Sequence, residues 1–530
     1  MHTKIILFAA TNESVSILLP AIKRLILNRA PYKEGPWMLT LWLILIPTLG
    51  GAAAFGLKPD ILRRLLLIGV GVAHLGLTVC TWFHPTEPLL GGWIHLDPLG
   101  RLFLTVTSIL FAASSIYLWG YLREQGATTQ VDLELGAFQN NSEAIFTGCL
   151  LWFLSSMTLV TMSQHFGLLW VMVEATTLSS APLIYFHRQH RSLEAAWKYL
   201  LICSVGIALA LMGNFLMAKA ASTAENGHVS LVVSDLVQHA KDLDLVWLKA
   251  AFLFFLVGYG TKIGLAPLHT WLPDAHSESP SAVSALFSGA LINCAFLALL
   301  RVVQVCHAAG LQEVTSQLLI GFGLLSMAFG AAFIFAQRDY KRLLAYSSVE
   351  NMGIQAFGVG LGGVATSGAL LHVLASGLTK GLMFLVAGNI MHTYQTKSTR
   401  DVAGLWRKMP WSGALWTFGF LSLTGAPPFA PFLSEFTILK GALETNHAVA
   451  GGLYLLLLAV VFIGMSAIVL KMSQGDPHPH CNPENVHGDW SSIGPPLVLC
   501  ALVAGLGLCI PPQLSDACRE AAISLGGSGW

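Results

Sequence analysis

Charged side chains are scarce in this sequence. Asp, Glu, Lys and Arg together make up 11% of its 530 residues, whereas hydrophobic residues make up 54%. A soluble domain has about 25% charged residues, and the mean hydropathy of this chain is +0.65. So few charges cannot cover the surface of a soluble protein of this length. The composition therefore excludes a soluble enzyme, a disordered chain and a fibrous repeat.

Several chemical signals are also missing. Lys and Arg number 29 against 28 Asp and Glu, which leaves no basic footprint for nucleic acid. The nine cysteines contain no CxxC pair, and Cys500, Cys509 and Cys518 have no metal-ligand spacing. There is no P-loop, and the GxGxxG match at 358–363 follows no strand. We therefore expect no metal, no cofactor and no catalytic centre of its own in this chain.

Long apolar runs dominate what is present. A membrane helix needs about 20 mainly apolar residues, and fourteen stretches meet this requirement. They cover roughly 37–56, 61–83, 98–120, 143–162, 165–186, 196–219, 246–270, 281–303, 313–336, 343–361, 365–391, 411–440, 449–471 and 494–512. Open strands cannot cross lipid, because their backbone groups would be unpaired. The sequence predicts an all-α polytopic membrane protein with about 14 transmembrane helices.

The segments outside the spans are short. The first, 1–36, is apolar over too few residues to span and has no clear cleavage site, so its status stays open; translation from Met38 is one interpretation. The rest of the chain divides into four parts that hold the spans. These are 37–142 with spans 1–3, 143–303 with spans 4–8, 313–471 with spans 9–13, and 494–530 with span 14 and a short tail.

Basic residues divide unevenly between the two membrane faces. Loops that follow odd-numbered spans hold fifteen Lys and Arg, and the other loops hold six, or eleven with the basic residues of 1–36. Basic residues favour the cytoplasmic side. We call the side that holds the loops after odd-numbered spans the odd-loop face. We expect this face to be cytoplasmic, in a bacterial inner membrane, with both termini on the opposite side.

Four ionisable residues within predicted spans are candidates for function: Glu174, Lys262, Lys380 and Glu435. A charged group at mid-membrane costs roughly 2.5–3.5 kcal/mol on insertion scales, so four would cost on the order of 10 kcal/mol. The alternative is that these Glu and Lys side chains form ion pairs that only hold helices together. Buried ion pairs, however, seldom stabilise a protein more than apolar packing does. We therefore interpret the four as parts of an ion pathway.

Proton transfer suits these residue types. Desolvation favours the neutral form of a buried lysine, and a nearby carboxylate favours its charged form. Glu174 and Lys262 form the natural switch, Lys380 would receive the proton, and Glu435 would release it on the far side. His372 and Lys380 lie two helical turns apart and share one face. A hydrogen-bonded core histidine is the alternative for His372.

Two of the predicted spans are interrupted. Lys262 is followed by Gly264 and Pro267, and Glu435 is preceded by a run that holds Gly425 and three prolines. Proline breaks helices, and interrupted spans in corresponding positions indicate a transport site. The interruptions fall in spans 7 and 12. Because five is an odd number of spans, we predict two inverted five-helix repeats, spans 4–8 and 9–13.

Weaker candidates lie near the ends of these spans. Glu194 and Lys198 have i, i+4 spacing and would feed the pathway or form a surface pair. His269 and His276 follow broken span 7 and would line a proton exit or cap the next helix. The cluster His478, His480, Cys481 and His487 has the residue types of a metal site, but a solvated polar loop is the better explanation, and we favour the loop.

Two long motifs carry a family resemblance. GYGTKIGLAPLHTWLPDAHSESPSAVSALFSGALIN and RDYKRLLAYSSVENMG resemble segments of the antiporter-like membrane subunits of respiratory complex I. The same family holds Mrp cation/proton antiporters and the membrane arms of group 4 hydrogenases. SLEAAWKYLLICSVGIALAL and LINCAFLALLR look closest to the hydrogenase branch, and within it to the F-type component. The resemblance covers roughly 140 to 470.

The resemblance implies roles for individual residues. Glu174 matches the family's glutamate of span 5, Lys262 its lysine of span 7, and Glu435 its Lys or Glu of span 12. Lys380 is similar to the span 11 lysine of the Mrp and hydrogenase branches. Two asparagines depart from the complex I pattern. Asn293 stands where span 8 often carries Lys or His, and Asn351 stands where a His often follows the start of span 10. An amide cannot relay charge by protonation.

Three functions compete for this chain. The leading hypothesis is a proton-translocating, antiporter-like subunit of a redox-driven complex, with further antiporter-like subunits and a peripheral hydrogenase-like or iron–sulfur arm as partners. The second is a Mrp-type subunit that exchanges Na⁺ or K⁺ for H⁺. The third is an inactive structural spacer, which Asn293 and Asn351 favour.

Overall fold

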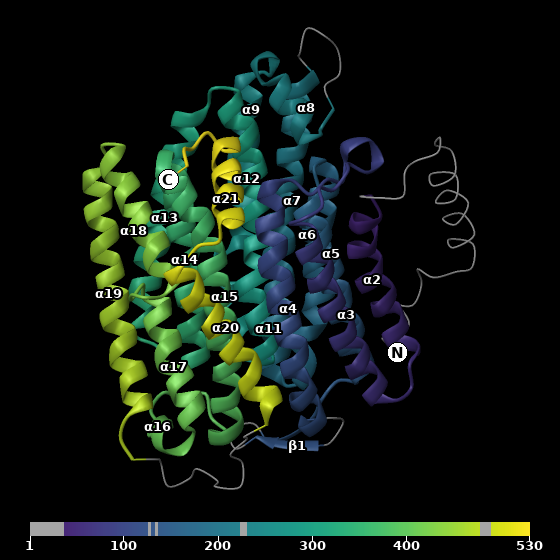
Figure 1. Cartoon of the computed structure of the whole chain (residues 1–530), viewed down its shortest axis with the longest axis vertical. Coiled ribbons are helices and arrows are strands. Elements are labelled where there is room, and N and C mark those ends of the chain that lie inside the picture. Colours follow the sequence, from purple (N-terminus) through teal and green to yellow (C-terminus); the bar gives the residue numbers. More distant parts are fainter. Residues whose placement is uncertain (1–36, 126–128, 133–135, 223–229, 477–488, 530) are drawn as a thin grey trace.

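Figure 1 shows the computed structural model of the chain, which describes residues 37–125, 129–132, 136–222, 230–476 and 489–529. Both the segment 1–36 and the histidine-rich stretch 477–488 lie outside the described residues. Long helices run side by side and form one bundle (Figure 1).

The predicted polytopic α-helical fold is confirmed. Twelve helical stretches of the described chain are long and apolar enough to cross a membrane. One is the segmented helix 281–308, and the others are α2 (Trp37–Gly56), α3 (Asp60–Cys80), α4 (Pro98–Gln125), α5 (Glu143–Met162), α6 (Phe166–Ile184), α7 (His190–Ser222), α9 (Leu245–Ile263), α13 (Gln312–Ile334), α15 (Gly363–Tyr394), α19 (Ala448–Ser473) and α20 (Trp490–Leu508). The two remaining predicted spans are α14 (Tyr340–Leu361) and the pair α17 (Pro410–Leu423) and α18 (Ala430–Glu444). All fourteen predicted spans are therefore helical.

Three spans are segmented. At the first break, α9 ends at Ile263, where Gly264 adopts a φ of 82° that favours glycine, and α10 (Trp271–Glu278) resumes after a turn. The next span is α11 (Ser281–Leu286), a π-turn η4 (Phe287–Leu291) and α12 (Ile292–Ala308). The third break separates α17 from α18. The breaks in spans 7 and 12 were predicted, whereas the π-turn was not.

Freed backbone groups at the first break are satisfied by side chains. The Ala266 amide donates to Ser326 Oγ of α13 at 2.9 Å, and Trp271 Nε1 donates to the Thr261 carbonyl at 2.8 Å. Non-helical backbone at membrane depth is tolerated only where protein or a cavity supplies such partners. Because Ser326 belongs to α13, the second predicted repeat supports the break in the first.

Short elements connect the spans. They are β1 (Thr129–Asp132) paired antiparallel with β2 (Gly136–Gln139), η1 (Leu90–Gly92), η2 (Tyr185–His187), α8 (Val233–Gln238), η3 (Ala240–Asp242), α16 (Leu405–Lys408) and α21 (Pro512–Ser524). The tail predicted after span 14 is thus partly helical. β1 and α16 lie at one end of the bundle and α8 and α21 at the other (Figure 1), as alternating odd and even loops require.

In each predicted repeat the third helix packs on the broken span. α7 lies mainly against α9, the first half of span 7, whereas α15 lies mainly against α18, the second half of span 12. Glycines bring the backbones together in both pairs: a Cβ on Gly206 would lie 2.7 Å from Thr261, and one on Gly441 would lie 2.6 Å from Ala365. Small residues allow such close approach in membranes.

A glycine seam also joins α13 to α14. A Cβ on Gly323 would lie 2.7 Å from the Phe357 amide and 2.8 Å from the Gly353 carbonyl, whereas Gly321 on the same helix faces open space. The seam therefore leaves no room for a side chain at Gly323.

Replacing Gly323 by Leu should separate α13 from α14 and destabilise the fold by about 1–3 kcal/mol, the usual cost of overpacking. Gly321→Leu is the matched control and should leave stability unchanged or slightly raised, since leucine favours helix. Thermal unfolding of the detergent-solubilised protein measures both. Equal transition temperatures for the two variants would contradict the seam.

A buried ion pair lies toward the face opposite the odd loops. Arg301 lies near the end of predicted span 281–303, and its side chain is 1% exposed within α12. Its Nη2 lies 2.5 Å from Asp97 Oδ1, and its Nη1 lies 2.6 Å from Oδ2. Burial alone would raise the pKa of Asp97, but the charge and hydrogen bonds of Arg301 outweigh it, so that pKa lies below its ordinary value.

Asp97→Asn should destabilise the protein at neutral pH by about 3–5 kcal/mol, because it leaves the buried Arg301 charge unpaired. A carboxyl with a depressed folded pKa stabilises above the unfolded pKa, about 3.9, and loses this contribution as pH falls through the folded value. The stability difference between wild type and Asp97→Asn should therefore shrink below about pH 4. Asp516→Asn, which removes an exposed pair with Arg519, is the control and should cost under about 1 kcal/mol at any pH.

Candidate functional site

Lys262 is fully buried in the last turn of α9, directly before the break. Its ammonium donates to Thr177 Oγ1 at 2.8 Å and to Tyr199 OH at 2.6 Å. The Nζ atom also lies 4.5 Å from the centre of the Tyr199 ring, a cation–π distance. Neutral oxygens and one aromatic face thus hold this lysine.

Glu174 lies one hydroxyl away from Lys262. Its Oε2 accepts from Thr177 Oγ1 at 3.2 Å, and its Oε1 accepts from Ser204 Oγ at 2.8 Å. Thr177 accepts from the lysine and donates to the carboxylate, so it bridges the two predicted members of the switch. The structure therefore brings Glu174 and Lys262 together through α6, with no direct ion pair between these two described residues.

Lys380 is 1% exposed in the middle of α15. Its ammonium donates to the Leu344 carbonyl at 3.2 Å and to Ser347 Oγ, both on α14. Among the residues that the structure describes, no carboxylate lies within ion-pair distance of this ammonium. Lys262 and Lys380 therefore share one feature, a buried cation held by neutral groups.

His372 lies two turns before Lys380, on the same side of α15. Its Nε2 is 3.2 Å from Asn351 Oδ1 of α14, and its Nδ1 is 2.9 Å from Ser434 Oγ of α18. The predicted shared face is confirmed, since His372 and Lys380 both contact α14. His372 therefore links α14 and α15 to the broken helix α18.

Glu435 packs over the break in span 12. Its carboxylate lies against Gly425, which has a φ of 66°, and any side chain at that position would collide with the carboxylate. The Tyr454 hydroxyl lies 3.4 Å from the Glu435 backbone carbonyl. Glycine at 425 therefore serves both the turn and the room for the carboxylate.

Glu350 is a further ionisable group that the predicted set omits. It is 2% exposed in α14, and its Oε2 has no hydrogen-bond partner among the described residues. Lys380 and Glu435 both interact with it electrostatically. A glutamate in the middle of the span predicted over 343–361 carries the same sequence signal as Glu174 does. It lies one position before Asn351, so α14 keeps an ionisable group there.

The two departures from the complex I pattern have different surroundings. Asn293 Nδ2 donates to the Gly289 carbonyl at 2.8 Å, within the π-turn η4, and its Oδ1 has no partner in the described part of the chain. Gly377 of α15 lies against Asn293. Asn351 instead orients His372. Asn293 satisfies freed backbone, as polar side chains do at irregular helix turns.

The weaker candidates separate into two groups. Lys198 Nζ pairs with Glu194 at 2.7 Å and with Asp274 of α10 at 3.0 Å, and about half of each Glu194 and Lys198 side chain is exposed. The predicted i, i+4 pair is confirmed, and it lies at the surface. His269 and His276 are buried instead, at 5% and 0% exposure.

The comparisons with known proteins agree with this architecture. The family described as NADH:quinone oxidoreductase/Mrp antiporter, TM matches residues 163–466. A hydrogenase-4 component F homolog of Methylacidiphilum infernorum is 34% identical over 82% of this chain and 89% of its own. The NADH-quinone oxidoreductase subunit N of Desulforudis audaxviator is 31% identical over 68% of this chain and 70% of its own.

A solved structure shares the fold. A chain of the Mrp complex from Dietzia sp. DQ12-45-1b superposes with a TM-score of 0.78 at 19% identity, over 92% of this chain and 97% of that one. The family match covers more than half of the chain, and the most similar of these relatives covers over two thirds of it. The chain is an integral, multi-pass membrane protein that belongs to the NADH:quinone oxidoreductase/Mrp antiporter family.

Proposed function

We propose that this chain moves protons across the membrane as an antiporter-like subunit of a redox-driven complex. The carrying observation is the row of ionisable groups within the spans: half-buried Glu174 and buried Lys262 in the first repeat, then buried Lys380, Glu350 and Glu435 in the second. Intramembrane charges are costly and mark ion pathways. Hydroxyls, carbonyls and amides surround them, and these groups also bind water.

The surroundings of the two lysines argue against a purely structural role. An ion pair that only holds helices together would place a carboxylate directly beside each ammonium, since a buried ion pair needs close geometry to offset desolvation. The Lys262 ammonium donates to Thr177 and Tyr199 instead, and the Lys380 ammonium donates to neutral groups of α14. A cation held this weakly can exchange its proton when a nearby charge moves.

The names of relatives support the redox branch of the proposal. A hydrogenase-4 component and an NADH-quinone oxidoreductase subunit lie among the relatives, at 34% and 31% identity. We propose that partner subunits carry the electrons, in a hydrogenase-like or iron–sulfur arm, and that other antiporter-like subunits lie beside this chain. The excess of Lys and Arg supports a cytoplasmic odd-loop face in a bacterial inner membrane.

Exchange of Na⁺ or K⁺ for H⁺ is the second candidate function, because the Dietzia Mrp chain has the same fold. Mass spectrometry of the subunits that copurify in mild detergent separates the two. Nickel–iron or iron–sulfur subunits would support the redox-driven pump. Small membrane subunits without redox partners would support the exchanger and contradict the redox proposal.

Lys262→Met should abolish proton translocation while the complex still assembles, because methionine fills the same space without a transferable proton. Lys249→Met is the matched control: it changes the same residue type on the same helix at an exposed position. Proton uptake into sealed vesicles that contain the complex provides the measurement. Translocation that survives in Lys262→Met would refute the switch.

Glu350→Gln should reduce translocation at least tenfold, because the amide keeps the shape of the side chain but cannot be protonated in the same range. Glu444→Gln, at an exposed position on α18, should translocate as wild type does. The vesicle assay measures proton translocation by both variants, relative to the amount of assembled complex. Normal translocation in Glu350→Gln would show that this glutamate lies beside the pathway and not in it.

A further inference from the structure

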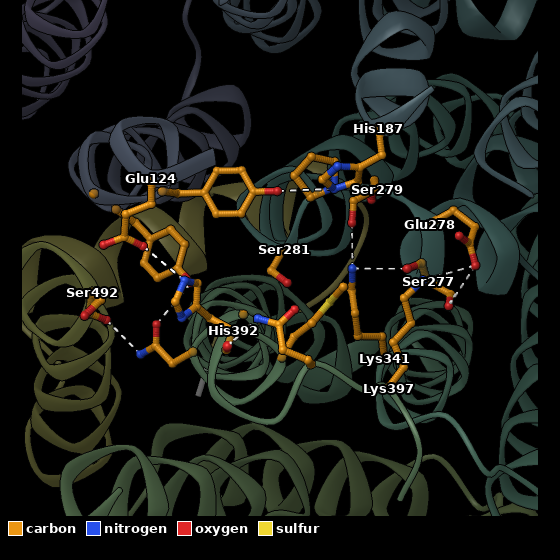
Figure 2. Close-up of a pocket in the computed structure, with 18 of the residues that line it drawn as sticks. Glu124, His187, Ser277, Glu278, Ser279, Ser281, Lys341, His392, Lys397 and Ser492 are labelled. Atoms are coloured by element: carbon orange, nitrogen blue, oxygen red, sulfur yellow. Dashed lines mark hydrogen bonds and ion pairs between the residues drawn. The ribbon is translucent and has the colours of Figure 1, made fainter. Parts of the chain in front are cut away.

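A cavity opens at the odd-loop face (Figure 2). Its volume is about 100 Å³, which leaves room for several water molecules. Every segment that lines it ends or follows an odd-numbered span. These segments are 117–124, 187–189, 277–281, 341, 388–397 and 489–492. The cavity therefore gathers six separate connections of one membrane face.

Titratable groups form the walls of this cavity. Lys397 pairs with Glu278 at 3.2 Å, and His392 pairs with Glu124 at 3.2 Å (Figure 2). The Tyr121 hydroxyl lies 3.2 Å from Nε2 of His187 in η2. A site of this composition binds water and exchanges protons with it.

Lys341 is a buried lysine that lines the cavity. It is 1% exposed, and its ammonium donates to the carbonyls of Ser277 and Ser279 at 3.2 and 2.6 Å (Figure 2). These carbonyls belong to the end of α10, where a positive charge is favoured by the helix dipole. Lys341 therefore joins the start of α14 to the end of the broken helix at the wall of the cavity.

His276 directly precedes the lining segment 277–281 and does not itself line the cavity. It is fully buried on α10, with its ring stacked on Phe384 at 5.0 Å. Neither ring nitrogen has a hydrogen-bond partner among the described residues. Lys341 and Lys380 both interact with it electrostatically. Buried polar atoms are nearly always hydrogen-bonded, so this imidazole is suited to bind water on two sides, between the cavity and Lys380.

Serine hydroxyls extend along the same direction. Ser279, which lines the cavity, lies 2.9 Å from Ser284 through their Oγ atoms. One turn further, Ser288 Oγ lies 2.6 Å from Ser348 Oγ. Ser348 donates to the Leu344 carbonyl at 3.0 Å, which also accepts from Lys380. Polar groups thus continue from the cavity to the buried lysine of the second repeat.

We propose that this cavity takes up protons from the odd-loop face and that His276 relays them to Lys380. A hydronium ion in the cavity gives up its proton, which water passes beside Lys341 to one ring nitrogen of His276, and the other ring nitrogen releases a proton to water beside Lys380. The neutral amine of Lys380 then becomes an ammonium, and the imidazole returns to its neutral form. Each passage moves one proton and leaves the imidazole as its other neutral tautomer, so ring rotation or proton exchange through water restores the starting tautomer before the next passage.

The inference rests on the proposed function, and it gives Asn293 a simple place. Asn293 cannot carry a proton. Uptake that enters at His276 reaches the second repeat without passing through that asparagine. The amide at span 8 is then free to satisfy the π-turn.

His276→Gln should reduce protons translocated per turnover at least tenfold, with the copurified subunits unchanged. His74→Gln is the matched control, because His74 is equally buried but bonded to Thr158 and Ser108 at 2.9 and 3.0 Å. It should stay within twofold of wild type. Normal translocation in His276→Gln beside an inactive Lys262→Met would overturn the relay alone. Normal translocation in both variants would overturn the proposed function.

A second measurement does not alter the buried histidine. Gln189 lines the cavity and is half-buried. A charged, membrane-impermeant thiosulfonate applied from the odd-loop face to Gln189→Cys should block translocation at least tenfold. Wild type treated alike controls for labelling of the native cysteines. Full labelling, verified by mass, with unchanged translocation would exclude the cavity as the site of proton uptake.

Discussion

The cost of unpaired polar groups in hydrocarbon governs this structure. A backbone amide or carbonyl without a partner costs several kcal/mol in lipid, so spans are helical unless protein fills each gap. The break after Ile263 exists because Ser326 and Trp271 take the freed groups. The π-turn in the next span exists beside Asn293, which donates to one of its carbonyls. Irregular backbone and buried polar side chains therefore occur together.

The same constraint shapes how the ionisable groups are held. Lys262 and Lys380 sit among hydroxyls and carbonyls, and Glu435 sits against a glycine turn that only a residue without a side chain can form there. These neutral polar groups solvate each ionisable side chain inside the membrane. They do not fix its protonation state as a tight ion pair would. Arg301 and Asp97 instead form a bidentate ion pair, and this geometry suits a structural role.

Contacts between the repeats connect their chemistry. Ser326 of α13 supports the break of the first repeat, and Lys341 of α14 holds the end of α10. Arg342 adds an ion pair to Asp274 at 3.1 Å. A movement of the broken helix α10 would therefore pull on the start of α14, whose next turns carry the partners of Lys380 and His372. This arrangement provides a physical link by which one repeat can influence the other.

Much of the fold follows from the sequence alone, because long apolar runs permit only helices in lipid and glycine with proline interrupts them. The positions of Glu174, Lys262, Lys380 and Glu435 follow from the rarity of charge inside such runs. The tertiary structure alone decided which groups meet. Thr177 bridges Glu174 and Lys262, and Arg301 is buried. Glu350 comes near Lys380 from the preceding helix α14, and His276 comes near Lys380 from α10, which is distant in sequence. Side-chain contacts across helices depend on crossing distance and rotation, which glycine seams set and no local pattern records.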